Sequence, residues 1–331
     1  MLSRVAENLF WIGRYMERAE NVARLIDAAR RMASLPQSVS HPRSNEWSSI
    51  LIAAGARETF GPTFETATDE QAAEHLLFSK DNPSSAWRCI EAARENARTI
   101  RFVLTREAWE VLNTSWSQMR FMHSSDATGA ALCDTIDWVK ARSAEFRGTV
   151  YGTMMRDDAF HFIRMGTAVE RLDYTARLID VKYHVLLPSV TEVGSGTDLD
   201  QWVSLLQAVA GHRAYIHATR DDVTARGVAE FLIRNETFPR SILYNAQLIT
   251  HHVRELGAFY ESEAPCSATV EAFEQSIAEK SIDDIFGYGL HEFLTAIIAA
   301  NYDVADSLAA AYGFAAFVSK PEADAEFPTT Q

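Results

Sequence analysis

Apolar residues recur along residues 2–26 of the chain at alternating spacings of three and four. The series is Leu2, Val5, Leu9, Ile12, Met16, Ala19, Ala23 and Ile26. This spacing keeps the series on one side of an α-helix and matches the a and d positions of a heptad repeat. It predicts a long amphipathic helix that ends near Ala33, because Pro36 follows shortly afterwards.

A second series with the same spacing predicts another long helix, which begins near Asp157 and stops before Pro188. Its apolar positions are Phe162, Met165, Val169, Leu172, Ala176 and Ile179. The two segments also share sequence, since residues 13–27 read GRYMERAENVARLID and residues 166–180 read GTAVERLDYTARLID. Eight of these fifteen positions are identical, whereas roughly one match would arise by chance. The chain therefore contains an internal repeat that includes charged residues.

The repeat extends beyond the two long helices. After the second copy the offset changes from 153 to 155 residues, and Trp47, Leu51 and Ala53 then match Trp202, Leu206 and Ala208. Further helices are predicted near residues 69–78, 84–104, 106–120, 132–155, 221–234, 239–259, 267–279 and 282–313. No run of alternating residues indicates a strand. These patterns predict an all-α helical bundle built from two duplicated multi-helix halves that are related by a pseudo-twofold axis.

The predicted halves cover about residues 1–155 and 156–318 and together form one domain, 1–318. A helical stretch that continues through residues 132–186 argues against a flexible linker between them. Residues 319–331 read SKPEADAEFPTTQ and are predicted to be a disordered tail.

Composition narrows the class of protein. The chain has 331 residues, of which 47% are hydrophobic and 23% charged, as is typical of a soluble globular protein. Its formal net charge of −14 argues against binding to nucleic acid, because an acidic surface repels phosphate. The N-terminal segment carries frequent charges, and no apolar stretch is long enough to span a bilayer. We therefore expect neither a signal peptide nor contact with a membrane, and a location in the cytoplasm.

No familiar cofactor or metal motif is present. The three cysteines are far apart and give neither a disulfide framework nor a metal site. The G-x-S-x-G, P-loop and H-E-x-x-H patterns are also absent. The sequence therefore predicts no cofactor and no metal.

An acidic residue stands four positions before an arginine in both copies of the repeat. The pairs are Glu20 with Arg24, and Asp173 with Arg177. This order favours an ion pair along the helix. Such pairs usually lie on a solvated face and contribute a few tenths of a kcal/mol.

Glu17 and Glu170 occupy a different position, because each directly follows an apolar residue of the seam. A charge beside a packed seam is partly desolvated and needs a partner. One arrangement that fits is a Glu–Arg lattice that joins the two long helices. The other is a pocket between these helices, in which arginines bind a carboxylate or phosphate ligand and the two glutamates orient them or act as bases.

The pocket hypothesis names specific residues. Glu17 and Glu170 are the catalytic candidates, and the candidate ligand-binding residues are Arg14, Arg18, Asn21, Arg24, Arg171 and Arg177. Both hypotheses place the two glutamates near each other and the two long helices in contact. Gly13 and Gly166 also predict close helix packing, since a glycine inside a helix costs about 1 kcal/mol relative to alanine.

The start of the chain, MLSRVAENLFWIGRYMERAENVARLID, and the later VERLDYTARLID closely resemble the bacterial alpha-E family, an all-helical family with a Glu-Arg motif. Segments 93–98, 108–113 and 231–241 add to this resemblance, which covers nearly the whole chain. Members of this family are typically encoded beside, or fused to, circularly permuted ATP-grasp proteins and transglutaminase-like proteins. The resemblance therefore implies that proteins of these two classes are its partners.

Three functional hypotheses follow. The first, from the resemblance, is a helical partner or substrate-binding module of an ATP-grasp-type peptide or amide ligase, which binds an acidic or peptide ligand or docks the ligase. The second is an enzyme in its own right that uses Glu17 and Glu170 with arginines in an inter-helix cleft. The third is a homo-oligomeric scaffold whose Glu-Arg faces form the subunit interface.

Overall fold

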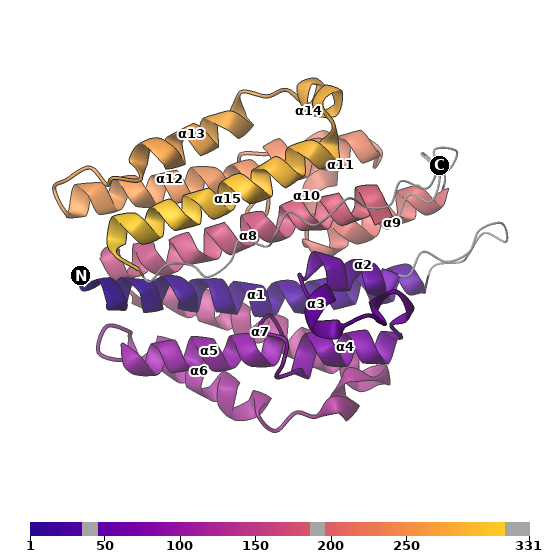
Figure 1. Ribbon diagram of the computed structural model, residues 1–331, viewed down its shortest axis with the longest axis horizontal. Coiled ribbons are helices and arrows are strands. Elements are labelled where there is room, and N and C mark those ends of the chain that lie inside the picture. The colour runs from indigo at the N-terminus through magenta and orange to yellow at the C-terminus, as the bar shows by residue number, and fades with distance from the viewer. Residues whose placement is uncertain (35–45, 186–195, 315–331) are drawn as a thin grey trace.

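Two layers of helices pack on a central pair of helices, α1 (Ser3–Ala33) and α8 (Asp158–Val185), which lie side by side in Figure 1. The computed structural model describes residues 1–34, 46–185 and 196–314. Within these ranges no strand occurs, which confirms the prediction of an all-α fold. The two central helices begin and end close to their predicted bounds, because their apolar spacing is regular over their full length.

The first layer packs on α1. It contains α2 (Glu46–Ala53), α3 (Arg57–Phe60), α4 (Asp69–Phe78), α5 (Ala86–Thr99), α6 (Arg106–Met119) and α7 (Gly129–Thr153), with two short 3₁₀ turns, η1 (Phe64–Thr66) and η2 (Ser124–Ala127). Helices α5 and α7 contact α1 directly, and α6 packs on the outside of both.

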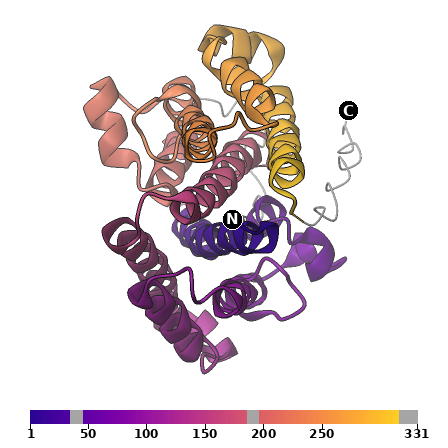
Figure 2. The ribbon, with the colours of Figure 1, turned by 90° about the vertical axis from the view of Figure 1, so that its left-hand side faces the viewer.

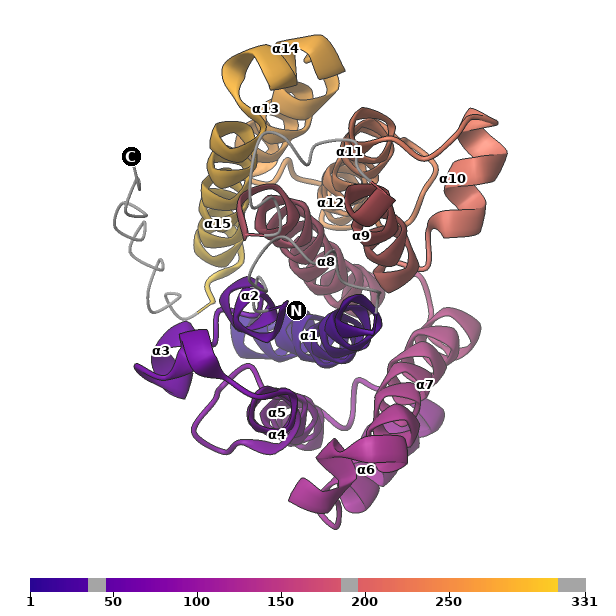
Figure 3. The same cartoon turned by 90° about the vertical axis from the view of Figure 1, so that its right-hand side faces the viewer.

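The second layer packs on α8. It contains α9 (Gly196–Ala208), α10 (His212–Thr219), α11 (Ala225–Arg234), α12 (Ile242–Phe259), α13 (Ser267–Ala278), α14 (Ile282–Tyr288) and α15 (Leu290–Tyr312). Helices α12 and α15 contact α8, and α13 covers α12 and α15 from outside. Seen end on, α1 and α8 lie between the two layers (Figure 2), and α10 stands apart at the edge (Figure 3).

The apolar seams face the interior as predicted. Leu9, Ile12 and Met16 of α1 are buried, as are Met165 and Val169 of α8. Because helices surround α1 on several sides, polar residues on its other faces are buried as well. Leu2, the first member of the predicted seam, is exposed because it precedes the helix.

Serine side chains fix where two helices begin. The hydroxyls of Ser85 and Ser241 accept hydrogen bonds from the backbone N–H groups of Arg88 and Tyr244, which starts α5 and α12. Each hydroxyl also donates to a carbonyl six residues earlier, Ser85 to Ser79 at 2.7 Å and Ser241 to Asn235. The two helices that flank the central pair therefore start in the same way.

Three sequence predictions about helix bounds are wrong. The helix predicted at 282–313 is two helices, because the backbone of Gly289 has a φ of +113° and ends α14 before α15 begins. The stretch 132–186 is interrupted between Thr153 and Asp158, where Met154 has an extended backbone. The helix predicted at 221–234 starts only at Ala225, since Thr224 caps it.

The predicted tail, residues 319–331, lies outside the described residues. Among the helices that the structure does describe, none combines the length and the apolar character needed to cross a membrane.

Candidate functional site

The central helices touch backbone to backbone at the two repeated glycines. A Cβ atom added to Gly13 would lie 2.1 Å from the carbonyl oxygen of Ile163, and one added to Gly166 would lie 2.0 Å from that of Phe10. No larger side chain fits at either position unless the helices separate. The prediction that these glycines mark close helix packing is confirmed.

Two reciprocal ion pairs lie beside this contact. Arg18 Nε and Nη2 donate to Glu170 Oε1 and Oε2 at 2.5 and 2.8 Å. Arg171 Nε and Nη2 donate to Glu17 Oε1 and Oε2 at 2.8 and 2.7 Å. Each arginine follows one repeated glutamate in sequence and binds the other glutamate across the helix interface in bidentate geometry. The central helices are therefore joined by exchanged Glu-Arg pairs.

Additional arginines surround Glu17. Arg240, from the turn before α12, lies 3.0 Å from Glu17 Oε1 and 2.6 Å from Glu20 Oε1. Arg147, from α7, donates to Glu17 Oε2 at 3.3 Å and also contacts Glu20. Arg24 Nε donates to Glu20 Oε1 at 2.8 Å. We call this group the Glu17 cluster: Glu17, Glu20, Arg24, Arg147, Arg171 and Arg240.

A smaller group surrounds Glu170. Arg14 Nε donates to Glu170 Oε2 at 2.9 Å, beside the Arg18 pair. One turn further along α8, Arg177 donates to Asp173 at 2.8 Å and to the hydroxyl of Tyr302 at 2.9 Å. We call this group the Glu170 cluster: Arg14, Arg18, Glu170, Asp173 and Arg177.

Both clusters are buried and ionised. Glu17 and Glu170 are 1% and 5% exposed. Burial alone would raise the pKa of Glu170, but Arg18 and Arg14 outweigh it and hold that pKa at about 2. Burial is likewise outweighed at Glu17 by Arg171 and Arg240, which keep its pKa well below the usual range. Both carboxylates therefore stay charged at neutral pH.

At the cation Arg240, burial prevails over the charges of its neighbours. Burial lowers its pKa to about 10, although Glu17 and Glu20 favour the charged form. It therefore remains protonated at neutral pH. Its Nη1 also donates to Asn21 Oδ1 at 3.1 Å, which brings Asn21 to the edge of the Glu17 cluster.

The structure pairs every arginine that the sequence singled out. Arg14, Arg18, Arg24, Arg171 and Arg177 each contact a carboxylate. The predicted pairs of Glu20 with Arg24 and of Asp173 with Arg177 are confirmed, but the expectation of a solvated face is wrong for Glu20, which is fully buried. The geometry is that of the Glu–Arg lattice, while binding of a ligand by these residues remains a prediction.

Sequence reasoning did not single out Arg147 and Arg240 as members of the site. The sequence pattern could have indicated Arg147, because Lys140, Ser143 and Arg147 form a polar row along one face of α7. Lys140 contacts Asp27 at 2.8 Å, and the Ser143 hydroxyl donates to Met16 O at 3.1 Å, so this polar face lies against α1. Arg240 lies in a turn, where helical spacing gives no such signal.

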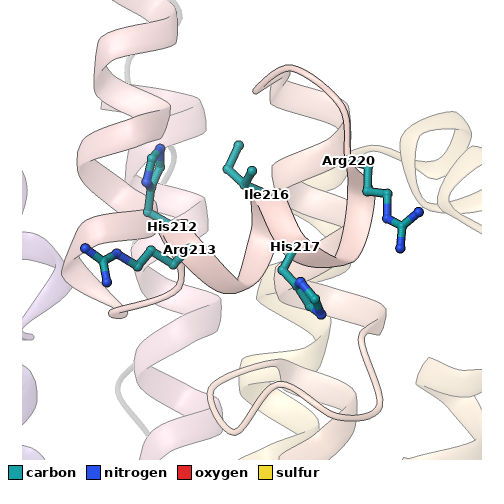
Figure 4. Close-up of a pocket in the computed structure, with 5 residues that line it drawn as sticks. All are labelled: His212, Arg213, Ile216, His217 and Arg220. Carbon is teal, nitrogen blue, oxygen red and sulfur yellow. The ribbon is translucent and has the colours of Figure 1, made fainter.

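Two open hollows lie away from both clusters. One, of about 560 Å³, is lined by His212, Arg213, Ile216, His217 and Arg220. All five residues belong to α10 or its end, and their side chains diverge rather than converge on one point (Figure 4). The other, of about 660 Å³, lies between α10 and α11. Across the part of the chain that the structure describes, no group of three or more His, Cys, Asp and Glu side chains could hold a metal ion.

A family model agrees with this architecture. The alpha-E model, described as a predicted alpha-helical domain with a conserved ER motif, matches residues 1–312. The chain belongs to the alpha-E family. It contains the dipeptide Glu-Arg twice, at 17–18 and 170–171, and these are the residues that exchange partners between α1 and α8.

The curated relatives are longer than this chain, and their names state no activity. The chain is 24% identical over 331 aligned residues to uncharacterised proteins of Mycobacterium bovis and Mycobacterium tuberculosis. The match covers 93% of this chain and 36% of each relative, so the chain spans about a third of their length. No solved structure matches the chain.

Proposed function

We propose that this alpha-E chain is a helical docking partner of an ATP-grasp-type peptide or amide ligase, and that its Glu-Arg pairs hold the central helices together. The burial and pairing of Glu17 and Glu170 carry this proposal. A general base needs a pKa near the working pH and access to the proton that it removes. With a pKa of about 2 and two arginines bound, Glu170 suits a structural role better than acid–base catalysis.

Exposed apolar side chains at one end of the bundle support a docking role. Phe102, which follows α5, is 81% exposed, and Met155, between α7 and α8, is 78% exposed. Leu2 and Phe259 are exposed as well. We call these four residues the apolar end. Large apolar side chains that gather on an exposed surface typically mark a protein–protein contact.

Contacts between helix ends bring these residues to the same side of the molecule. The hydroxyl of Tyr260, at the end of α12, donates to Asp158 at 2.7 Å, and the N-terminal amino group lies 3.6 Å from the same carboxylate. Thr105, before α6, and Thr153, at the end of α7, are hydrogen-bonded at 2.8 Å. These helix ends lie together at the left of Figure 1.

The length of the relatives favours a further protein domain as the occupant of this surface over a second copy of the chain. In the mycobacterial relatives the matching region is accompanied by about twice its own length of further sequence. A module that accompanies other domains needs a surface on which they dock, and the apolar end supplies one.

Isothermal titration with an ATP-grasp-type ligase of the class typically encoded beside alpha-E proteins tests the proposal. Wild-type protein is expected to bind, and Phe102→Asp and Met155→Asp to weaken binding by about tenfold or more, because each places a charge in an apolar contact. Phe121→Asp is the matched control, since Phe121 is exposed beyond the opposite end of α6. Absence of wild-type binding together with unchanged ligase turnover would refute the proposal. A wild-type dimer that Phe102→Asp dissociates would favour the scaffold hypothesis instead.

We further infer that the two layers are duplicated halves related by a pseudo-twofold axis. The exchanged Glu-Arg pairs, the mutual contact of Gly13 and Gly166, and the matching caps of Ser85 and Ser241 support this inference. An isologous interface produces this kind of reciprocal contact. An experimental structure in which residues 1–155 and 156–314 failed to superpose helix by helix would contradict it.

A further inference from the structure

A buried arginine outside both clusters lacks a counter-charge. Arg164, on α8, is 5% exposed. Its Nε atom is sealed from solvent and has no hydrogen-bond partner, and no carboxylate of the described residues forms an ion pair with it. The buried Arg14, Arg171 and Arg240, by contrast, all contact carboxylates. A buried charge normally has a partner, because desolvation of an isolated ion costs several kcal/mol.

The nearest carboxylate cluster has no capacity left for Arg164. Glu17 lies close enough to influence the pKa of Arg164, but its lone pairs are already occupied. Oε1 accepts from Arg171 and lies 3.0 Å from Arg240 Nη1, and Oε2 accepts from Arg171 and Arg147. A carboxylate offers about four acceptor positions, so the chain itself supplies no further acceptor for Arg164 from this group.

Two buried histidines lie beside Arg164. His252, on α12, and His161, on α8, share a hydrogen bond between their Nδ1 atoms at 2.9 Å. Burial, with a further contribution from the charge of Arg164, lowers the pKa of His252 to about 2, so the ring is neutral. The direction of the shared bond depends on the tautomers of the two rings. In the tautomer in which His161 donates, the proton of His252 resides on Nε2, which is buried and has no partner. In that tautomer a donor and a cation both lack an acceptor here.

An aromatic ring covers the guanidinium on its outer side. Arg164 lies 4.7 Å from the centre of the Tyr151 ring, which itself is half exposed at the end of α7. This cation–π contact stabilises the charge by about 1 kcal/mol, but it satisfies none of the N–H donors. Since Nε is sealed from solvent, a ligand would have to approach the guanidinium at its terminal amino groups.

We propose that Arg164 and His252 form a binding site for a single oxyanion, either a carboxylate or a phosphate group. The planar guanidinium presents paired donors that match two oxygens of such a group, and His252 Nε2–H supplies a third donor. The site goes beyond ligase docking, because it takes a small anionic ligand at residues that belong to neither the Glu-Arg clusters nor the apolar end.

Thermal unfolding of the full chain in sodium phosphate and in sodium acetate tests this site, with sodium chloride at equal ionic strength as the reference. Specific binding raises the melting temperature in proportion to the logarithm of anion concentration. A rise with phosphate alone identifies a phosphate ligand, and a rise with acetate identifies a carboxylate. If neither anion raises the melting temperature above the chloride reference, the proposal is overturned.

Variants separate this site from general anion effects. Arg164→Met is expected to abolish the anion-dependent rise, and it folds because it removes an unpaired buried charge. Arg156→Gln is the matched control. Arg156 lies over the same Tyr151 ring, but its guanidinium already donates to the carbonyls of Met154 and Tyr151 at 2.9 and 2.7 Å. Retention of the rise in Arg164→Met, or its loss in Arg156→Gln alone, would contradict the assignment.

A measurement on the wild-type chain avoids dependence on any variant. Binding of an oxyanion at His252 Nε2 should shift the nitrogen resonances of that ring, while those of the exposed His251 stay in place. Equal shifts at both histidines, or none at His252, would place the anion elsewhere and overturn the proposal.

Discussion

Replacement of Gly13 by alanine is the most direct test of the central helix contact. In an isolated helix this change would be favourable by about 1 kcal/mol, because alanine has the higher helix propensity. In this chain the added Cβ would lie 2.1 Å from Ile163 O and 3.1 Å from Thr167 N, whereas ordinary contact begins at 3.4 Å. Both atoms belong to the backbone of α8 and cannot rotate away. The helices must therefore separate by roughly 1 Å locally.

The energy of this separation exceeds the gain in propensity. Overpacking of a well-packed interior costs about 1–3 kcal/mol and occasionally more, and a gap of roughly 1 Å forfeits up to half of the dispersion energy of each contact beside it. With a cost at the upper end of that range, about 3 kcal/mol, subtraction of the propensity gain leaves a loss of about 2 kcal/mol in the free energy of unfolding of Gly13→Ala. For a chain of this length that corresponds to a melting temperature lower by roughly 3 °C. Gly166→Ala should behave alike.

The matched control is Gly148→Ala. Gly148 is exposed inside α7, and an added Cβ there would meet nothing within 4 Å. Only the propensity effect remains, so this variant should melt about 1 °C above wild type. Differential scanning calorimetry of the three variants measures the contrast. A melting temperature for Gly13→Ala equal to that of Gly148→Ala would refute the argument from backbone contact.

Three further predictions follow from the same structure. Glu170→Gln leaves Arg14 and Arg18 without a charged partner and should lower the free energy of unfolding in urea by about 3–5 kcal/mol, whereas Glu110→Gln on the surface should leave it unchanged. Because the pKa of Glu170 is held at about 2, below the ordinary glutamate value of 4.5, the folded state binds fewer protons than the unfolded state. Its stabilising effect should be complete above about pH 4.5 and decline as the pH falls toward 2, which urea midpoints across that range would show. Gly289→Ala places a Cβ at a φ of +113° and should cost about 1–2 kcal/mol in thermal unfolding, and an unchanged melting temperature would contradict the assigned break between α14 and α15.

The sequence predicts the central helices well because local and tertiary preferences agree there. The apolar spacing of α1 and α8 is regular, and Thr or Ser caps start several of the neighbouring helices. Prediction fails at residues 282–313, because the apolar spacing continues across Gly289 and only the backbone conformation breaks the helix. It also omits α10, a short helix whose apolar content is low.

The candidate site was predictable only in part. The position of Glu17 and Glu170 beside the seam indicates buried charge, and their partners on the opposite central helix follow from the repeat. Arg147 and Arg240 reach the cluster from α7 and from a turn, and only tertiary packing brings these segments to α1. The absence of a partner at Arg164 is likewise a property of the packed molecule and leaves no trace in the sequence pattern.

Comparison of the two copies of the repeat distinguishes residues that join the central helices from residues suited to binding a ligand. The exchanged Glu-Arg pairs and the glycine contact occur in both copies of the repeat, as a device that joins two helices requires. Some arginines outside these pairs do not occur in both copies of the repeat. At an offset of 153 residues, Arg164 aligns with Trp11. Arg240 directly precedes Ser241, the cap of α12, whereas Ser84 directly precedes Ser85, the equivalent cap of α5. Arg14 is unmatched as well, since Thr167 stands at its equivalent position, but Arg14 and Arg240 are both paired with carboxylates. Arg164 is the unmatched arginine whose Nε has no partner among the described residues, so it is the position where an anionic ligand should be sought first.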